Sequence, residues 1–166
     1  ANGALSAAFV HLFRESIRPA QRLKVSSGGK KLYRIGIHSN VKSNADFTDG
    51  HVWLSSEKSG TNGMRTYGLW NNNPSVFGVL SGGLGNGVTL NKEGAYRAQA
   101  SKFFLIDRVQ YNTFQNYINT PDTWYITNTC AEWARDAIYT TTGNYLDVDD
   151  NFGIETPREL SRTLGK

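Results

Sequence analysis

The chain has 166 residues and a mass of 18.4 kDa, a length typical of one compact domain. Apolar residues make up 39% and aromatic residues 12%, which indicates a globular protein and excludes an intrinsically disordered one. The single cysteine, Cys130, excludes an intramolecular disulfide and a cysteine-rich metal site. A net charge of +4 is compatible with an anionic partner such as cell wall, lipid head groups or nucleic acid, but it selects none of them.

The N-terminal segment predicts a helix and no membrane span. Over residues 4–18, Leu5, Phe9 and Leu12 recur at helical spacing, and Pro19 ends the pattern. No basic region precedes an apolar run, so the segment does not have the form of a secretory signal peptide. The apolar stretches of the chain are far shorter than the roughly 20 residues that cross a bilayer.

Strands are expected in the next part of the chain. Residues 32–37 alternate between apolar and polar side chains, which predicts a half-buried strand. Residues 50–55 and 64–70 flank a turn and together predict a β-hairpin. Residues 71–95 are rich in Asn and Gly, carry little periodic signal, and are expected to form one long loop. The glycines of this loop match no phosphate-binding motif.

A strand and then helices are expected after that loop. A strand is predicted within residues 96–106, and Asp107 with Gln110 forms a capping box for a helix over 108–119. A second helix is expected to contain Cys130 and to run to about Thr141. A third helix starts with the Thr-Pro-x-Glu pattern at 156–159. This order of elements indicates a single domain of the α+β class, with a small antiparallel sheet packed against helices.

Cys130 falls in the first turn of the second of these helices. Thr127 or Asn128 can cap it, and Gly143 can end it after Thr141. The helix dipole and the free N–H groups of a first turn favour thiolate over thiol, and the same N–H groups can hold an oxyanion during acyl transfer. Cys130 is therefore either a nucleophile or a small apolar core residue, and its position alone does not separate the two.

A histidine in one of the predicted strands is the candidate general base. Val52 and Leu54 form an apolar strand face, so His51 and Trp53 point to the other face. A strand histidine preceded by a glycine that leaves the backbone accessible suits a general base. The alternative is a half-buried histidine that pairs with a loop. His38, at the end of the preceding strand, is a competing candidate.

These residues resemble a known group of enzymes. A strand histidine far upstream of a cysteine that opens a helix reverses the papain order and is similar to the circularly permuted papain-like group, which includes relatives of NlpC-type cell-wall peptidases and lecithin:retinol acyltransferase. Asn-x-Cys-x-x-Trp-Ala at 128–134, Gly-His-Val-Trp at 50–53 and Thr-Tyr-Gly-Leu-Trp at 66–70 also resemble toxin domains of type VI secretion effectors. The similarity runs from about residue 31 to the end, including Glu-Thr-Pro-Arg-Glu-Leu at 155–160, and leaves residues 1–25 outside.

The resemblance implies a role for each matching position. Cys130 would be the nucleophile, and His51 would be the base that takes its proton. The third, orienting residue would come from the next strand, where Thr66 and Tyr67 are the polar side chains and neither is the usual Asn, Asp or His. A dyad, or a triad completed by a backbone carbonyl, stays open. Asn128 either lines the oxyanion site or caps the helix.

Other residues are candidates for contact with a substrate, a metal ion or nucleic acid. Trp53 and Trp70 flank the predicted site and are expected to line a substrate groove. Asp147–Gly153 imitates the start of a calcium loop, but its glycine comes one place late and Arg158 stands where a bidentate Glu is needed. No metal or cofactor is therefore expected. The basic residues form no stripe with interleaved aromatics, so no nucleic-acid partner is expected.

The resemblance implies a cysteine amidase or peptidase that passes through a thioester at Cys130. The implied substrate is a peptidoglycan stem peptide, and the implied role is that of a secreted antibacterial effector delivered to the periplasm of a target bacterium, with a cognate immunity protein as partner. Two alternatives stay open. The same pair can serve a phospholipase or acyltransferase in contact with a membrane surface, or a protein deamidase. A non-enzymatic toxin or binding module would instead keep Cys130 in its core.

Overall fold

The structure of the protein is a computed structural model that describes residues 30–71, 85–124, 128–150 and 153–165. Over these residues the fold is α+β, as the sequence predicts, with a five-stranded antiparallel sheet and three α-helices. The helix predicted over residues 4–18 lies outside the described part of the chain. Within the described part, no helix has both the length and the apolar character that a bilayer crossing needs.

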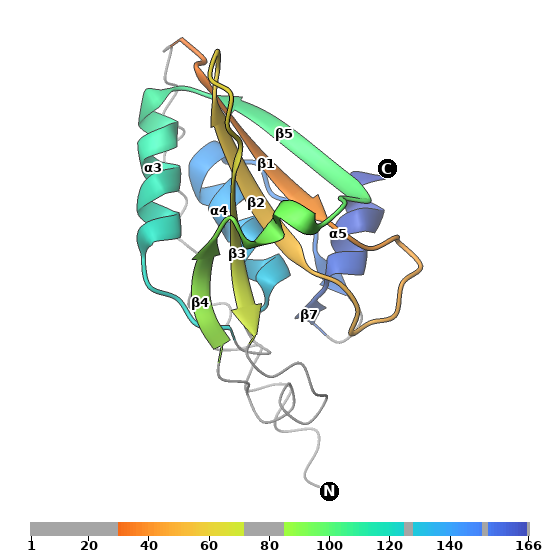
Figure 1. The fold of residues 1–166 in the computed structure, drawn as a ribbon. Coiled ribbons are helices and arrows are strands. Elements are labelled where there is room, and N and C mark those ends of the chain that lie inside the picture. Colours follow the sequence, from red (N-terminus) through yellow and green to blue (C-terminus); the bar gives the residue numbers. More distant parts are fainter. Residues whose placement is uncertain (1–29, 72–84, 125–127, 151–152, 166) are drawn as a thin grey trace, which may run out of the picture.

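The sheet has the strand order β4-β3-β2-β1-β5, and each neighbouring pair is antiparallel (Figure 1). Side chains alternate between the faces of a strand, so apolar residues at every second position build one buried face. Ile37 and Leu54 are register partners on this face, and both are fully buried. The predicted hairpin is confirmed by the pairing of β2 with β3. The strands are β1 (Tyr33–Ser39), β2 (Val52–Lys58), β3 (Arg65–Asn71), β4 (Gly85–Leu90) and β5 (Ala100–Ile106).

Two of the predicted helices have the bounds and caps that their sequences favour. In α3 (Arg108–Asn119), the Asp107 carboxylate accepts the N–H of Gln110, and the Gln110 side chain accepts the N–H of Asp107, which confirms the capping box. In α5 (Pro157–Leu164), Thr156 is the N-cap and proline occupies the first helical position, as predicted. Such caps satisfy N–H groups that have no partner inside the helix.

The third helix, α4 (Cys130–Thr142), is capped by Thr129, whose hydroxyl accepts the N–H of the third helical residue. The prediction of Asn128 as the cap is wrong, because the Asn128 side chain turns to the preceding segment, and Thr127 lies outside the described residues. Gly143 ends the helix with a φ of 75°, a left-handed conformation that glycine adopts without a steric penalty.

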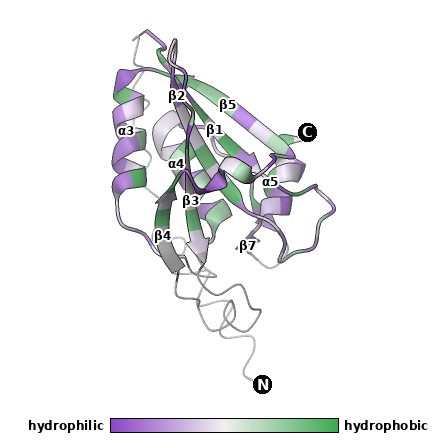
Figure 2. Cartoon of the chain, in the orientation of Figure 1, coloured by the Kyte–Doolittle hydropathy of each residue, from purple (hydrophilic) through white to green (hydrophobic). Residues whose placement is uncertain are grey.

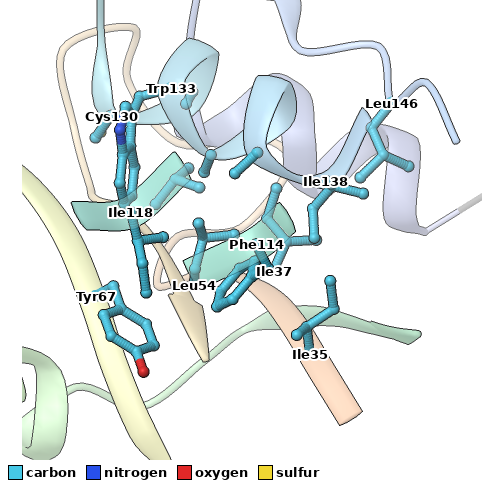
Figure 3. Packing of buried hydrophobic residues seen from close by; sticks show 14 of the residues in the cluster. Ile35, Ile37, Leu54, Tyr67, Phe114, Ile118, Cys130, Trp133, Ile138 and Leu146 are labelled. Carbon is cyan, nitrogen blue, oxygen red and sulfur yellow. The ribbon is translucent and has the colours of Figure 1, made fainter. Parts of the chain in front are cut away.

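The core lies between the sheet and α4, with α3 beside it. Ala131, Ala134 and Ala137 line the buried side of α4, and their small side chains let the helix approach the strands closely. Phe114 and Ile118 of α3 complete the cluster (Figure 3). Each fully buried large aliphatic or aromatic side chain contributes about 1.5–3 kcal/mol relative to an exposed one. Figure 2 shows the hydrophobic residues gathered along the central strands.

The prediction of one long loop over residues 71–95 is wrong for its second half. Residues 85–90 form β4, the strand at the edge of the sheet beyond β3, and Lys92–Ala95 form a 3₁₀ turn, η1. The strand escapes detection because glycines occupy positions 85 and 87 and leave only a short stretch in which alternation is visible. In Figure 1, η1 crosses the face of the sheet opposite α4.

The segment between β1 and β2 is braced against α5. Carbonyl oxygens of this segment accept hydrogen bonds from three side chains of the helix: Arg158 to Ala45 at 3.3 Å, Ser161 to Val41 at 2.7 Å and Arg162 to Ser43 at 2.9 Å. Short strands β6 (Asp149–Asp150) and β7 (Ile154–Glu155) precede α5. The bracing holds residues of the segment beside the start of α4, where the candidate site lies.

Candidate active site

Cys130 is the first residue of α4 and lies at the edge of the core with 7% of its surface exposed. The backbone N–H groups of Val52 and Ala131 act on its sulfur and lower the pKa of the thiol. Thr129 fixes this helix end, since its hydroxyl donates to the backbone carbonyl of Glu155 at 3.0 Å while it caps α4. The sequence prediction that Cys130 opens a helix is therefore confirmed, and the backbone around it carries several N–H donors.

His51 directly precedes β2, and its backbone N–H donates to Oδ1 of Asn40 at 2.7 Å. The neighbouring Gly50 has a φ of 91°, and a Cβ there would lie 2.5 Å from Cγ1 of Val41, so this tight entry into the strand requires glycine. The imidazole is 7% exposed, its ring centroid lies 4.0 Å from that of Trp70, and the influence of Cys130 raises its pKa.

A carboxylate that the sequence did not identify completes the arrangement. Glu93 of η1 is 2% exposed, and its Oε1 lies 3.4 Å from Nε2 of His51. Trp70 Nε1 donates to Oε1 of Glu93 at 2.8 Å, and Thr66 Oγ1 donates to Oε2 at 2.7 Å. A carboxylate held by two other donors has a fixed orientation, so it can orient the imidazole.

Gly68 of β3 provides the room in which these groups meet. A Cβ at this position would collide with Oε1 of Glu93 and would lie 2.7 Å from Nε2 of His51. Any larger residue at position 68 would therefore separate the imidazole from the carboxylate.

The site favours the charged forms of cysteine and histidine. Burial by itself lowers the pKa of His51, but Cys130 and Glu93 outweigh it and raise that pKa to about 9. Burial raises the pKa of Cys130, yet His51 and the N–H groups of Val52 and Ala131 bring it below its usual range. Both shifts stabilise a thiolate–imidazolium pair near neutral pH.

The pKa of Glu93 is also shifted in the direction that favours its charged form. Burial raises the pKa of Glu93, but hydrogen bonds from His51, Thr66 and Trp70 lower it below the usual value. Glu93 is therefore ionised near neutral pH, and its negative charge faces the protonated ring of His51. The carboxylate lies on the side of the imidazole where it stabilises positive charge on the ring.

The two polar residues predicted on β3 have different positions. Thr66 contacts the site, but through Glu93 rather than through His51. Tyr67 lies on the opposite face of the sheet, where its ring packs against Phe114 and its hydroxyl bonds to that of Ser56 at 3.0 Å (Figure 3). The expectation that Tyr67 could orient the base is therefore corrected, because neighbouring strand residues point to opposite faces.

Asn128 and Trp53 also lie elsewhere than expected. The Asn128 amide donates to Oδ1 of Asp122 at 2.7 Å and to the carbonyl of Thr123 at 2.9 Å, so it ties the chain before α4 together instead of facing Cys130. Trp53 is 4% exposed and its ring stacks near those of both His51 and His38, so it supports the site from within and is not among the residues that line the cavity beside Cys130. Both expectations of substrate contact are corrected.

His38 does not compete for the role of base. Its Nδ1 lies 2.8 Å from the hydroxyl of Ser101, and its Nε2 lies 2.7 Å from that of Ser55, so both ring nitrogens are bonded within the sheet. Burial, and then the charge of Arg34, lowers the pKa of His38 to about 4. The ring stays neutral near pH 7 and is linked to His51 only through Trp53.

A cavity of about 250 Å³ opens beside Cys130 and His51. Trp70 lines it, as predicted, and Trp124 lines it as well. The remaining walls come from the segment before β2, from β3, from the cap of α4 and from the chain around β7. These residues are Phe47, Thr48, Gly50, Leu69, Thr129, Ile154, Glu155, Thr156 and Pro157. The sulfur therefore faces a space that can receive part of a substrate.

No metal site accompanies these residues in the described ranges, where no group of three or more His, Cys, Asp or Glu side chains could hold an ion. Asp150, in the sequence that imitates a calcium loop, instead accepts hydrogen bonds from Thr156 and Arg158.

Glu93 is the functional candidate that sequence reasoning missed. The one signal in the sequence was an acidic residue shortly after β4, in a segment that is otherwise rich in Asn and Gly. Asn91 turns the chain there with a φ of 56°, and its side chain accepts the N–H of Thr66 at 3.0 Å. This contact ties the turn to β3 and brings Glu93 over His51.

Comparisons with known protein families, with curated proteins and with solved structures give no match to this chain.

Proposed function

We propose that the protein is a cysteine hydrolase in which Cys130 is the nucleophile, His51 transfers the proton and Glu93 orients His51. One observation carries this proposal: the buried imidazole of His51 is influenced by both the Cys130 thiol and the Glu93 carboxylate, and both raise its pKa. Nε2 faces Glu93, which leaves Nδ1 as the nitrogen available to the thiol. A nucleophile, a base and an orienting group in this sequence form the arrangement that acyl transfer requires.

The proposed reaction has two stages. The Cys130 thiolate attacks the carbonyl carbon of an amide, and the negative charge that develops on the oxygen is stabilised by N–H groups at the start of α4. The C–N bond then breaks, and the leaving amine takes the proton from His51. Water next gives a proton to His51 and attacks the thioester, and the C–S bond breaks to release the acid and restore the thiolate.

The permuted papain-like architecture is part of the same proposal. The order of the three groups along the chain supports it, since His51 and Glu93 come from the sheet side and precede the cysteine helix. Packing of α4 against the central strands supports it as well, because this packing places the helix start beside the beginning of β2.

The substrate that we propose is an amide bond in a peptidoglycan stem peptide, and the role is that of an antibacterial effector acting in the periplasm of a target cell. The resemblance of 50–53, 66–70 and 128–134 to effector toxin domains supports this choice, and the net charge of +4 is compatible with an anionic wall. A producing cell would then need an immunity protein that covers the Cys130 cavity.

The catalytic pair is tested by alkylation, since Cys130 is the single cysteine of the chain. Iodoacetamide should label the native protein rapidly near pH 6, where an ordinary thiol is almost entirely protonated. His51→Ala should remove this rapid labelling, whereas His38→Ala, which alters a neighbouring histidine, should keep it. A native thiol that reacts no faster than that of the urea-unfolded protein would contradict the proposal.

The substrate is tested by product analysis. Purified sacculi incubated with the protein should release fragments with new amine and carboxyl ends, and Cys130→Ala should release none. Phospholipid vesicles serve as the parallel arm: release of fatty acid, with intact sacculi, would replace the amidase by a lipid acyl hydrolase. Expression in the periplasm should be toxic and expression in the cytoplasm harmless. The reverse pattern would point to an intracellular target such as a protein side-chain amide.

A further inference from the structure

The cavity beside Cys130 has walls that are mainly apolar. Six of the residues that line it carry apolar or aromatic side chains: Phe47, Leu69, Trp70, Trp124, Ile154 and Pro157. Leu69 is fully buried, and the six residues come from four parts of the chain, around 47, 69–70, 124 and 154–157, that meet only in the fold. These six side chains contact apolar groups well and offer nothing to the charge of an ion.

Of the three threonines that line the same cavity, Thr48 is exposed at its edge, and the hydroxyls of the other two are already used by the fold. Thr129 Oγ1 donates to the carbonyl of Glu155 and accepts an N–H as the cap of α4. Thr156 Oγ1 donates to Oδ2 of Asp150 at 2.9 Å and accepts an N–H as the cap of α5. Turning either hydroxyl toward a ligand would break a helix cap and leave a backbone N–H without its partner.

The charged groups of the cavity are paired as well. Apart from His51 and Cys130, the one charged residue among those that line it in the described part of the chain is Glu155. Its side chain is 4% exposed, and its Oε1 accepts a hydrogen bond from Nη1 of Arg135 at 3.4 Å. Away from His51 and Cys130, a charged substituent of a substrate would therefore lose its water in this cavity without gaining an ionic partner.

We infer that this cavity is a subsite that selects an apolar, uncharged acyl group for transfer to Cys130. The inference rests on the proposed function, because it assigns a preference to the group that becomes the thioester. A volume of about 250 Å³ is larger than a cavity of roughly 150 Å³ that holds benzene and smaller than the roughly 300–1,000 Å³ of sites for drug-sized ligands. The subsite therefore takes one side chain or a short acyl chain, not a whole lipid tail.

Two esters of p-nitrophenol test this preference. The hexanoate ester and the monoadipate ester differ at the end of the chain, where a methyl group is replaced by a carboxylate. For each ester, kcat/KM is divided by the rate constant for hydroxide attack, which removes the difference in intrinsic reactivity. The hexanoate should be preferred at least tenfold, because the end of the acyl chain lies away from His51, where a desolvated carboxylate has no partner. The positive net charge of the protein acts against this result, so the preference cannot come from long-range attraction.

A variant of the cavity wall gives a second readout. Ile154→Lys places an ammonium group in the cavity and should raise the relative kcat/KM for the adipate ester at least fivefold. Leu105→Lys adds the same charge on the exposed face of β5, where the residue is 67% exposed and lines no part of the cavity, and should leave the ratio unchanged. Far-UV circular dichroism of both variants checks that they fold.

The outcomes separate the two proposals. Equal normalised rates for the two esters, with both activities lost in Cys130→Ala, would overturn the subsite and leave the cysteine hydrolase standing. No hydrolysis of either ester above the level of Cys130→Ala would contradict the proposed function itself and the subsite with it. A preference for hexanoate that shifts in Ile154→Lys but not in Leu105→Lys supports both.

Discussion

Nε2 of His51 lies 3.4 Å from Oε1 of Glu93, and this contact joins the start of β2 to the turn that follows β4. The two residues are 42 positions apart, and both are almost fully buried. The contact gives the imidazole a fixed carboxylate partner and contributes to its raised pKa. The behaviour of the thiol should therefore depend on a residue that does not touch it.

Glu93→Gln is the direct test of that dependence. Removing the carboxylate charge should lower the pKa of His51 and bring the pKa of Cys130 back toward its usual range, so the pH midpoint of iodoacetamide labelling should rise. Hydrolysis of an active substrate should fall on the order of 100-fold, because the base loses its orienting partner. Glu57→Gln, which breaks an ion pair with Arg34 at the partly exposed end of β2, is the matched control and should leave both measurements unchanged. An unaltered labelling profile in Glu93→Gln would mean that the carboxylate has no influence on the pair.

Neighbouring substitutions on β3 should have opposite consequences. Thr66→Val removes the donor to Oε2 of Glu93, so it should reduce hydrolysis several-fold and leave a buried oxygen without that bond, at about 1–3 kcal/mol. Tyr67→Phe removes the bond to Ser56 on the other face of the sheet, so it should cost about 1 kcal/mol of stability with unchanged hydrolysis. Initial rates and urea unfolding of both variants check the pair. A loss of activity in Tyr67→Phe with none in Thr66→Val would reverse the assignment of the two faces.

Trp70 has two contacts that a single pair of variants separates. Trp70→Phe keeps an aromatic ring against His51 but removes the Nε1 donor to Glu93, so the pH midpoint of labelling should rise less than in Glu93→Gln. Trp70→Ala also opens the wall of the cavity and should raise KM in addition. In the double variant Trp70→Phe/Glu93→Gln, the effects on labelling should not add, because both act through the same carboxylate. Fully additive shifts would show that Trp70 acts on His51 by another route.

His38 should make the fold sensitive to acid. Its pKa is about 4 in the folded protein and about 6.5 when unfolded, so between these values the unfolded state binds more protons. The free energy of unfolding should therefore fall as the pH drops from 6.5 to 4, by about 3 kcal/mol at most. His51 contributes little below about pH 5.5, because its folded pKa is raised to about 9 and its unfolded pKa is about 6.5, so it is protonated in both states there.

Urea unfolding of the wild type and of His38→Gln at pH 7 and at pH 4.5 measures this effect. The variant has no titrating group at this position, so its loss of stability on acidification should be smaller than that of the wild type. An equal loss in both proteins would place the acid sensitivity in other groups.

Much of the secondary structure is readable from the sequence because it depends on local signals. These signals act within a few residues of the chain. The capping box of Asp107 and Gln110 starts α3, the Thr156-Pro157 pattern starts α5, and the glycine at 143 ends α4, each at the position that the sequence predicts. The hairpin of β2 and β3 follows from two alternating runs on either side of a turn. Strand β4 has no such signal, because its glycines remove the alternation.

The candidate site also has some features that local sequence patterns predict and others that depend on the tertiary fold. By itself the sequence determined that Cys130 opens a helix and that His51 shares a strand face with Trp53, since helix capping and strand alternation are short-range effects. Only the tertiary structure decided that Glu93, and not Tyr67, faces His51. That contact requires β4 to pair with β3 and η1 to fold back over a position without a side chain, Gly68. Pairing between strands brings together residues that are far apart in the chain, and no local pattern records which of them will meet.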